Sequence, residues 1–174
     1  RYIIGSPQPE VPLPSGLREY LALAECPVHV MSYESAELTK LSANVVLAAS
    51  ITAANSLAEL AESVGADWRE MEPALREDSR IGQQSYISPG LGIGGANLAR
   101  DLLGIEALAE ARGVNASFVR ALLEHSDHMR DWTMRVVTRV RQEQSLDRLG
   151  ILGLAYKPGT TSTRGGAGQV LVEA

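Results

Sequence analysis

The dominant pattern in the chain is one long apolar helix. Residues 34–64 contain no proline or glycine, and Gly65 follows where a left-handed residue commonly ends a helix. Apolar residues lie on most sides of this helix: Ala43, Val45, Val46, Leu47, Ala48, Ile51, Ala54, Leu57, Ala58 and Ala61. A helix that is apolar nearly all round is buried in a core or an interface. At ~1.5 Å per residue it would be about 45 Å long, so we expect a second subunit to cover part of it.

Three further helices are predicted after a glycine at position 65, with a Gly- and Pro-rich loop over residues 79–95. Their predicted limits are an Asp67 cap to about Leu75, about Asn97 to Ala111 with a break near Gly104, and an Asn115 cap followed by Ala116 to about Gln144. The last helix carries one apolar stripe at steps of three and four: Phe118, Leu122, His125, Met129, Trp132, Val136 and Val140.

Short β/α pieces flank this helical body. Strands are predicted at residues 2–4 and 27–31, with a proline-rich stretch and a helix over about 16–24, capped by Ser15, between them. A glycine-punctuated strand is predicted at 149–155, and a helix begins near Gly168. The predicted fold class is mainly α, built on the long helix. Because the chain opens in a strand and stops at a helix start, we expect it to be the middle of a longer protein.

Composition narrows the function classes. The 174 residues are 45% hydrophobic and 21% charged, as in ordinary globular proteins. The net charge of −5 argues against a nucleic-acid-binding surface and against an anchor to an anionic membrane. The sequence has no uninterrupted run of about 18 apolar residues, so no membrane-spanning helix is predicted. The one cysteine, Cys26, excludes an intrachain disulfide and suits a cytoplasmic protein. His29, His125 and His128 lack metal-ligand spacing, so no metal is expected.

The glycines of the central loop form a candidate binding motif. Gly90-Leu-Gly92-Ile-Gly94-Gly95 matches the dinucleotide pattern GxGxxG, but Pro89 precedes it where a strand is needed. A glycine-rich loop also lets the backbone approach another ligand or chain. The remaining alternative is that these glycines only make tight turns.

Lys40 and Asn44 lie four residues apart and therefore share one face of the long helix. A lysine beside an amide suits alcohol oxidation, because the cation holds the oxygen on which charge shifts and the amide orients it. The alternative is a solvated lysine and a polar break in a buried helix.

Three other charged residues are candidates for the functional site, and each also has a simple structural explanation. Asp101, four residues after Asn97, is either a base or a carboxylate that complements the helix dipole. Lys157 and Arg164 flank a Thr/Ser-rich loop, and either bind phosphate or carboxylate or are surface charges.

Taken in order, these segments resemble the UDP-glucose/GDP-mannose dehydrogenase family over nearly the whole chain. The segments that carry the resemblance are Ser35–Asn44, Gly65–Asp67, Asp78–Gly82, Pro89–Asp101 and Leu152–Thr160 with Arg164. The resemblance implies NAD-dependent oxidation of the primary alcohol of a nucleotide sugar, by a homodimer joined through the long helix. It also implies three domains: the end of an NAD-binding Rossmann domain at 1–30, a central helical domain at 31–144, and the start of a nucleotide-sugar-binding Rossmann-like domain at 145–174.

The resemblance also assigns residue roles. Lys40 and Asn44 match the family's pair at the reacting carbon, and Asp101 matches the acid that helps to activate water. Among the substrate-binding positions, Arg80 matches an arginine lent to the partner subunit, and Tyr86 and the Gly90–Gly95 loop match the segment that wraps the substrate. Lys157 and Arg164 match residues that close the site, the latter on the cofactor side.

One departure changes the expected chemistry. The family has a nucleophilic cysteine where this chain has Asn97, and Arg100 replaces the lysine before the acid. An amide cannot form the thiohemiacetal needed for a second hydride transfer, and Cys26 lies outside the motif. We therefore expect a single two-electron oxidation, as in the β-hydroxyacid dehydrogenases that the Lys-x-x-x-Asn spacing also resembles. The alternative is a catalytically inactive scaffold for dimerisation or sugar-nucleotide binding.

Overall fold

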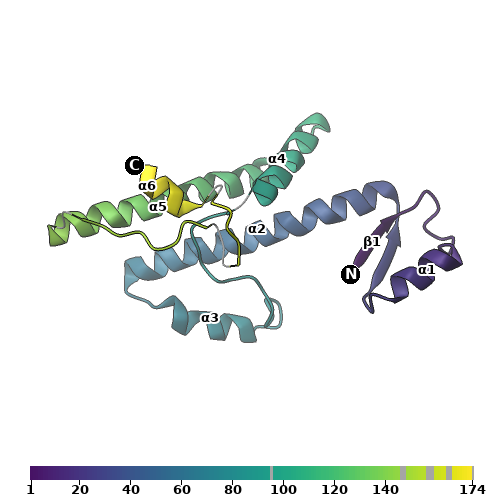
Figure 1. The fold of residues 1–174 in the computed structure, drawn as a ribbon, viewed down its shortest axis with the longest axis horizontal. Coiled ribbons are helices and arrows are strands. Elements are labelled where there is room, and N and C mark those ends of the chain that lie inside the picture. The colour runs from purple at the N-terminus through teal and green to yellow at the C-terminus, as the bar shows by residue number, and fades with distance from the viewer. Residues whose placement is uncertain (95, 146–147, 156–158, 164–165, 174) are drawn as a thin grey trace. The chain divides into compact units, whose positions relative to one another are not determined.

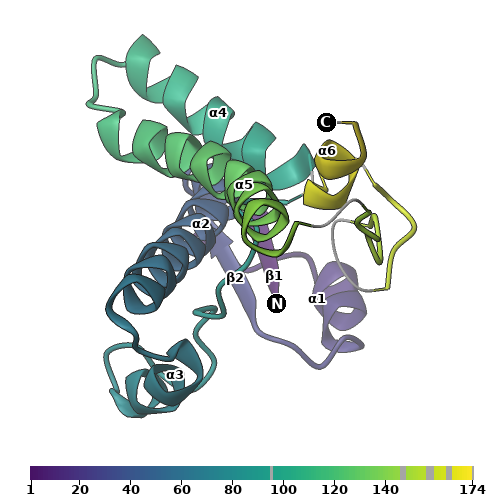
Figure 2. The ribbon, with the colours of Figure 1, turned by 90° about the vertical axis from the view of Figure 1, so that its left-hand side faces the viewer.

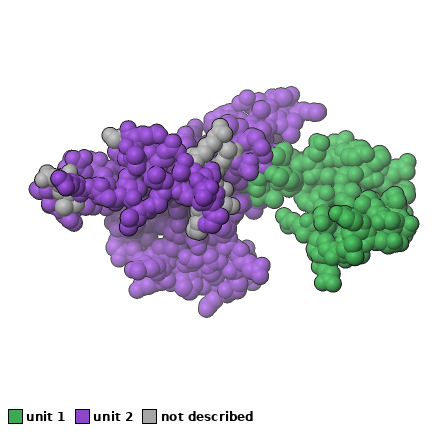
Figure 3. All heavy atoms as spheres, viewed as in Figure 1, with its two compact units in different colours: residues 1–44 green, residues 45–174 purple. Residues whose placement is uncertain are grey.

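The computed structural model describes the whole chain except residues 95, 146–147, 156–158, 164–165 and 174. The described residues form two strands and six helices, which gives the mainly α fold that the sequence predicts (Figure 1). They divide into two compact units, residues 1–44 and 45–174 (Figure 3). The division falls inside the long helix, and the domain boundaries near residues 30 and 144 stay predictions.

The first unit opens with a strand–helix–strand element. Strands β1 (Tyr2–Gly5) and β2 (Val28–Met31) pair in parallel, with Tyr2 opposite Val28 and Gly5 opposite Met31. Helix α1 (Ser15–Ala22) connects them, and Ser15 is its first residue rather than its cap. The cap is Pro14, because its carbonyl oxygen accepts the N–H groups of Leu17 and Arg18.

Helix α2 (Tyr33–Val64) confirms the predicted long helix. The hydroxyl of Ser32 accepts the Ser35 N–H at its start. Gly65 has φ of +76°, and the Ala66 N–H donates to the Ala61 carbonyl, which is the expected glycine-terminated end.

The part of α2 in the second unit has both buried and exposed apolar side chains. Ala48, Ala54 and Ala61 are buried, whereas four larger residues are exposed: Val46, Leu57, Leu60 and Val64. Helix α2 is long and apolar enough to cross a membrane, by length and composition only. Core helices of soluble proteins can be equally long and apolar. Coverage by a second subunit and the absence of a membrane span both stay predictions.

Helices α3 and α4 follow with one correction. Helix α3 (Trp68–Glu77) has the predicted cap, since the Asp67 carboxylate accepts the Arg69 N–H at 2.8 Å. Helix α4 (Ala96–Ala111) runs through Gly104 without the predicted break. One glycine in a helix costs about 1 kcal/mol, and the fully buried Leu102 together with Ile105 packs this part of α4 into the core.

Helix α5 (Ser117–Gln144) begins one residue later than predicted and pairs with α4 as a helical hairpin (Figure 2). Leu122 and Met129 are buried as predicted. The other buried residues of α5 are Val119, Ser126 and Thr133, each one position after a residue of the predicted stripe. Phe118, predicted as buried, is 59% exposed. The core of this unit joins α2, the central loop, α4 and α5 through Ala48, Ile93, Leu102, Val119 and Leu122.

The predicted strand at 149–155 is wrong. These residues have no regular structure, and Gly153 has φ of +89°, which a strand does not allow. Among the described residues, β1 and β2 pair only with each other, so no neighbouring strand is there to bind this segment. Helix α6 (Ala167–Glu173) begins one residue before the predicted start.

Candidate functional site

Helix α2 carries the candidate catalytic pair of the first unit. Lys40 and Asn44 lie one turn apart on the same face of the helix, as predicted. Lys40 is exposed, and Asn44 is half-buried. An ammonium and an amide on one helix face can hold and orient a single substrate oxygen.

The second candidate pair lies at the start of α4 in the second unit. Asn97 is exposed, whereas Asp101 is only 4% exposed. The guanidinium of Arg100 donates to Asp101 Oδ1 through Nη2 at 3.0 Å and Nε at 3.2 Å. No acidic residue lies in the first turn of α4, and the effect of the helix dipole falls off within one turn. Asp101 is therefore a buried, charge-paired carboxylate that is not placed to complement the helix dipole, and its role as a base stays a prediction.

The glycine-rich loop before α4 is fixed by two side chains. The Gly90 N–H donates to Asn55 Oδ1 on α2 at 2.6 Å. The Ile93 N–H donates to Ser126 Oγ on α5 at 2.8 Å. Gly92 between them has φ of +83° and lies against Ser126, so that an added Cβ would be 2.7 Å from the Ser126 carbonyl oxygen.

The preceding part of the loop, around Tyr86, is held by α3. Arg76 Nη1 donates to the carbonyl oxygens of Gln83 and Ser85, both at 2.8 Å. Glu72 accepts from Arg76 Nη2 at 2.6 Å and from Ser88 Oγ at 3.2 Å. These bonds hold the backbone before Tyr86 and the side chain of Ser88 after it, whereas the Tyr86 side chain is exposed.

Arg80 extends from the same loop. Its side chain is 87% exposed, and its guanidinium forms an ion pair with Asp78 at 2.5 Å. The side-chain hydrogen bond from Arg80, supported by the Arg80 backbone N–H, holds the pKa of Asp78 below its ordinary value. Because Arg80 pairs with Asp78, two residues before it in the same turn, the Arg80 guanidinium stays accessible to solvent.

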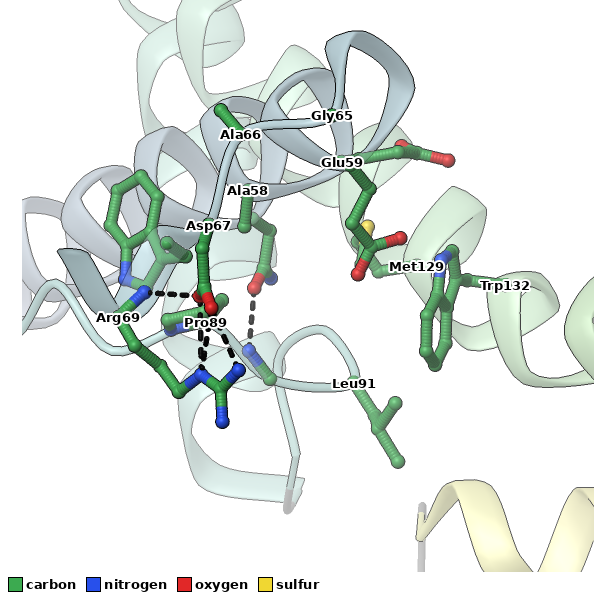
Figure 4. Close-up of a pocket in the computed structure, with 14 residues that line it drawn as sticks. Ala58, Glu59, Gly65, Ala66, Asp67, Arg69, Pro89, Leu91, Met129 and Trp132 are labelled. Carbon is green, nitrogen blue, oxygen red and sulfur yellow. Dashed lines mark hydrogen bonds and ion pairs between the residues drawn. The ribbon is translucent and has the colours of Figure 1, made fainter. Parts of the chain in front are cut away.

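The inner side of the loop borders a pocket of about 560 Å³ between the end of α2, the start of α3 and α5 (Figure 4). Glu59, Asp67 and Trp132 are among the residues that line it. Of the predicted site residues that the structure describes, only Gly90 lines this pocket. The pocket is therefore not the place where the predicted catalytic residues meet.

The loop does not fit a dinucleotide cofactor. A coil precedes Gly90 where the dinucleotide fingerprint requires a strand. Its Gly90 and Ile93 N–H groups, which would face a pyrophosphate, are bound by Asn55 and Ser126. The dinucleotide interpretation of this motif is thus disfavoured by the geometry.

Three of the predicted site residues have no described position. Gly95, Lys157 and Arg164 lie outside the described residues, whereas Gly94 is described and exposed. Within the described part of the chain, no group of three or more His, Cys, Asp or Glu side chains could hold a metal ion. The expectation of no metal stays a prediction.

Sequence reasoning missed the residues that shape the loop. Asn55, Ser126 and Arg76 carry no recognised motif. A signal did exist for Asn55, because it interrupts an alanine-rich buried helix. A buried polar residue at such a position indicates a hydrogen-bond partner elsewhere in the fold. No signal existed for Ser126, because the predicted apolar stripe of α5 passes through His125 instead.

Comparison with known proteins decides the family. The sequence model of the central domain of the UDP-glucose/GDP-mannose dehydrogenase family matches residues 34–128, more than half of the 174 residues. The chain belongs to the UDP-glucose/GDP-mannose dehydrogenase family. The match covers Lys40, Asn44, the glycine-rich loop and Asp101, and it excludes Lys157 and Arg164.

Two curated members of the UDP-glucose/GDP-mannose dehydrogenase family show how much of a relative the chain represents. UDP-glucose 6-dehydrogenase AglM of Haloferax volcanii is 33% identical over 150 residues, which are 85% of this chain and 34% of the relative. UDP-glucose 6-dehydrogenase TuaD of Bacillus subtilis is 31% identical over 138 residues, 79% of this chain and 30% of the relative. The chain spans about a third of the length of the curated relatives it matches.

Solved structures of dehydrogenases have the same fold as this chain. A UDP-glucose dehydrogenase from Pyrobaculum islandicum superposes with a TM-score of 0.80 at 31% identity, covering 91% of this chain and 38% of that one. A UDP-D-ManNAc dehydrogenase from Pyrococcus horikoshii superposes with a TM-score of 0.73 at 23% identity, covering 91% and 38%, and this likeness shows the fold alone. The predicted fold class and family are confirmed.

Proposed function

We propose that this chain is the central part of an NAD-dependent nucleotide-sugar dehydrogenase that oxidises a sugar alcohol in one two-electron step. The observation that carries the proposal is the occurrence of Lys40, Asn44 and Asp101 within the family-matched region, with Asp101 buried directly after an anchored glycine-rich loop. UDP-glucose dehydrogenases among the relatives support a UDP-sugar as substrate.

The proposed step converts an alcohol into a carbonyl. The substrate carbon loses a hydride, and the hydroxyl proton passes to the Asp101 carboxylate, directly or through a water. The Lys40 ammonium stabilises the negative charge that develops on the substrate oxygen, and the Asn44 amide orients that oxygen. NAD, when bound, accepts the hydride, so that one NADH and one proton form for each alcohol oxidised.

A single step follows from the residue at position 97. A second oxidation of the aldehyde in this family proceeds through a thiohemiacetal with a cysteine, as the resemblance implies. Asn97 offers an amide, which is not a nucleophile at neutral pH. The aldehyde or ketone would then leave as the product.

We assign NAD binding mainly to an N-terminal domain outside this chain, with Arg164 as a cofactor-binding residue within the chain. A parallel strand–helix–strand element, β1–α1–β2, is the kind of unit from which nucleotide-binding domains are built. We further propose a cytoplasmic protein with no nucleic-acid partner and no membrane anchor.

We also propose that the protein is a homodimer joined through α2. Support comes from the four exposed apolar side chains Val46, Leu57, Leu60 and Val64 on that helix, and from the exposed Arg80, which the family lends to the partner's substrate. Light scattering of the full-length protein at micromolar concentration should give a dimer. A monomer would contradict this part of the proposal.

A second candidate function is a catalytically inactive scaffold that binds a sugar nucleotide or dimerises. Two points favour it: the resemblance puts Asn97 where the family has its nucleophile, and the Arg100 guanidinium forms an ion pair with Asp101. The two candidates differ in whether any substrate-dependent NADH forms.

The experiment that separates them is a turnover assay. Full-length protein is incubated with NAD and a panel of UDP- and TDP-sugars, and NADH is followed by absorbance. The dehydrogenase predicts turnover that Lys40→Ala reduces by at least about a hundredfold. Arg139→Ala removes an exposed cation from α5 and serves as the control with unchanged turnover. The absence of NADH with every sugar would favour the scaffold.

A further inference from the structure

We propose that Asn55 and Ser126 are positioning residues of the nucleotide-sugar site, which set the shape of the glycine-rich loop before substrate binds. This inference rests on the proposed function, because the loop acts on a sugar nucleotide only if the protein binds one. It assigns to two residues outside every motif a role in substrate affinity. The evidence is a pair of buried side-chain acceptors, each aimed at one backbone N–H of the loop.

Asn55 is an unusual residue for its place. It is 2% exposed, in the middle of α2, on a helix whose other buried residues in this unit are alanines. A buried amide costs free energy unless it is hydrogen-bonded. Its Oδ1 accepts the Gly90 N–H at 2.6 Å, across a separation of 35 residues. A leucine or alanine would serve the helix equally well, so the amide is explained by what it does to the loop.

Ser126 is the matching anchor on the other side. It is 5% exposed on the inward face of α5, and its Oγ accepts the Ile93 N–H at 2.8 Å. The Ile93 side chain then lies in the core with Ala48 and Leu102. The bond therefore fixes both the backbone of the loop and a core side chain.

The two anchors are three residues apart on the loop, and Gly92 makes the tight approach between them possible. An added Cβ at Gly92 would meet the Ser126 carbonyl oxygen at 2.7 Å and Oγ at 3.1 Å. Leu91 and Gly94, in contrast, remain exposed. The loop thus has an inner edge bound to α2 and α5 and an outer edge available to a ligand.

The two hydrogen bonds to the loop also bear on the position of the candidate base, Asp101. Leu102, which packs with Ile93, is the next residue after Asp101 and is fully buried. A shift of the loop at Ile93 would disturb the packing at the start of α4. Loss of an anchor is therefore expected to affect substrate affinity first and turnover second.

Ser126→Ala and Thr133→Ala form the matched pair for the test. Both delete a buried hydroxyl from the same face of α5, but the Thr133 hydroxyl donates only to the Arg130 carbonyl of its own helix. A merely structural role of Ser126 would lower the melting temperature in both variants and would not change the KM for the substrate. A positioning role predicts a change of KM in Ser126→Ala only.

The assay uses full-length protein with UDP-glucose and NAD as probes. We expect the KM for UDP-glucose to rise about five- to tenfold in Ser126→Ala and in Asn55→Leu, as for one lost hydrogen bond. The KM for NAD should stay within about twofold, because the Gly90 and Ile93 N–H groups that a dinucleotide would need are already bound by Asn55 and Ser126. Asn55→Asp keeps an oxygen acceptor at the same position and should recover most of the lost affinity for UDP-glucose.

Hydrogen exchange gives a readout that needs no activity. The Ile93 amide should exchange faster in Ser126→Ala, and the Gly90 amide faster in Asn55→Leu, while Thr133→Ala changes neither. Wild-type turnover combined with unchanged KM for UDP-glucose in both anchor variants would overturn the positioning assignment alone. If the wild type neither binds nor oxidises UDP-glucose or any other sugar of the panel, the proposed function fails and this assignment fails with it.

Discussion

Replacing Gly92 by alanine tests the geometry of the loop most sharply. The change has two costs. The first is conformational, because the φ of +83° at Gly92 is one that L-residues rarely adopt, and such a residue costs about 1–2 kcal/mol. The second is steric, because the new Cβ would lie 2.7 Å from the Ser126 carbonyl oxygen, a backbone atom that cannot rotate away. Overpacking of this kind costs about 1–3 kcal/mol.

Gly82→Ala separates the two costs. Gly82 has a similar φ of +88°, but an added Cβ there meets nothing within 4 Å. Gly82→Ala should therefore show only the conformational cost, and Gly92→Ala should lose about 1–3 kcal/mol more. The measurement is the local opening free energy of residues 82–94, from native-state hydrogen exchange of the full-length protein. Equal losses in the two variants would refute the close approach of Gly92 to Ser126.

Two further predictions concern the loop and the contact between α2 and α5. Arg76→Lys should weaken the loop around Tyr86 by about 1.5–3 kcal/mol, because an ammonium cannot reproduce the guanidinium's paired bonds; unchanged exchange of residues 83–86 would contradict it. The pKa of Glu59 lies below its ordinary 4.5, chiefly through the hydrogen bond with His128. A lowered folded-state pKa gives stability that is present above pH 4.5 and is lost as the pH falls through the folded value. Glu59→Gln should therefore flatten the acid side of the stability profile, and an unaltered profile would disprove the pairing.

Local signals in the sequence were enough to predict most helices. The absence of breakers, the glycine at position 65 and the Asp67 cap each act within a few residues, and the structure has α2 and the start of α3 where they indicate. The break at Gly104 was wrong because tertiary packing of Leu102 outweighs the propensity of one glycine.

The errors arose where distant contacts decide the outcome. The inward face of α5 includes Ser126 because an N–H group 33 residues away needs an acceptor, whereas the apolar Phe118 is exposed. Periodicity alone favours the opposite choice at both positions. The candidate site divides in the same way: residue types and order point to Lys40, Asn44 and Asp101, whereas the side chains that shape the loop emerge only from its three-dimensional contacts.

We propose that the protein carries out one oxidation per nucleotide sugar. The most direct measurement is the number of NADH molecules formed for each UDP-sugar consumed by the full-length protein at completion, with the product identified by mass spectrometry. We expect one NADH per sugar and an aldehyde or ketone product. Two NADH per sugar with a uronic acid as product would contradict it.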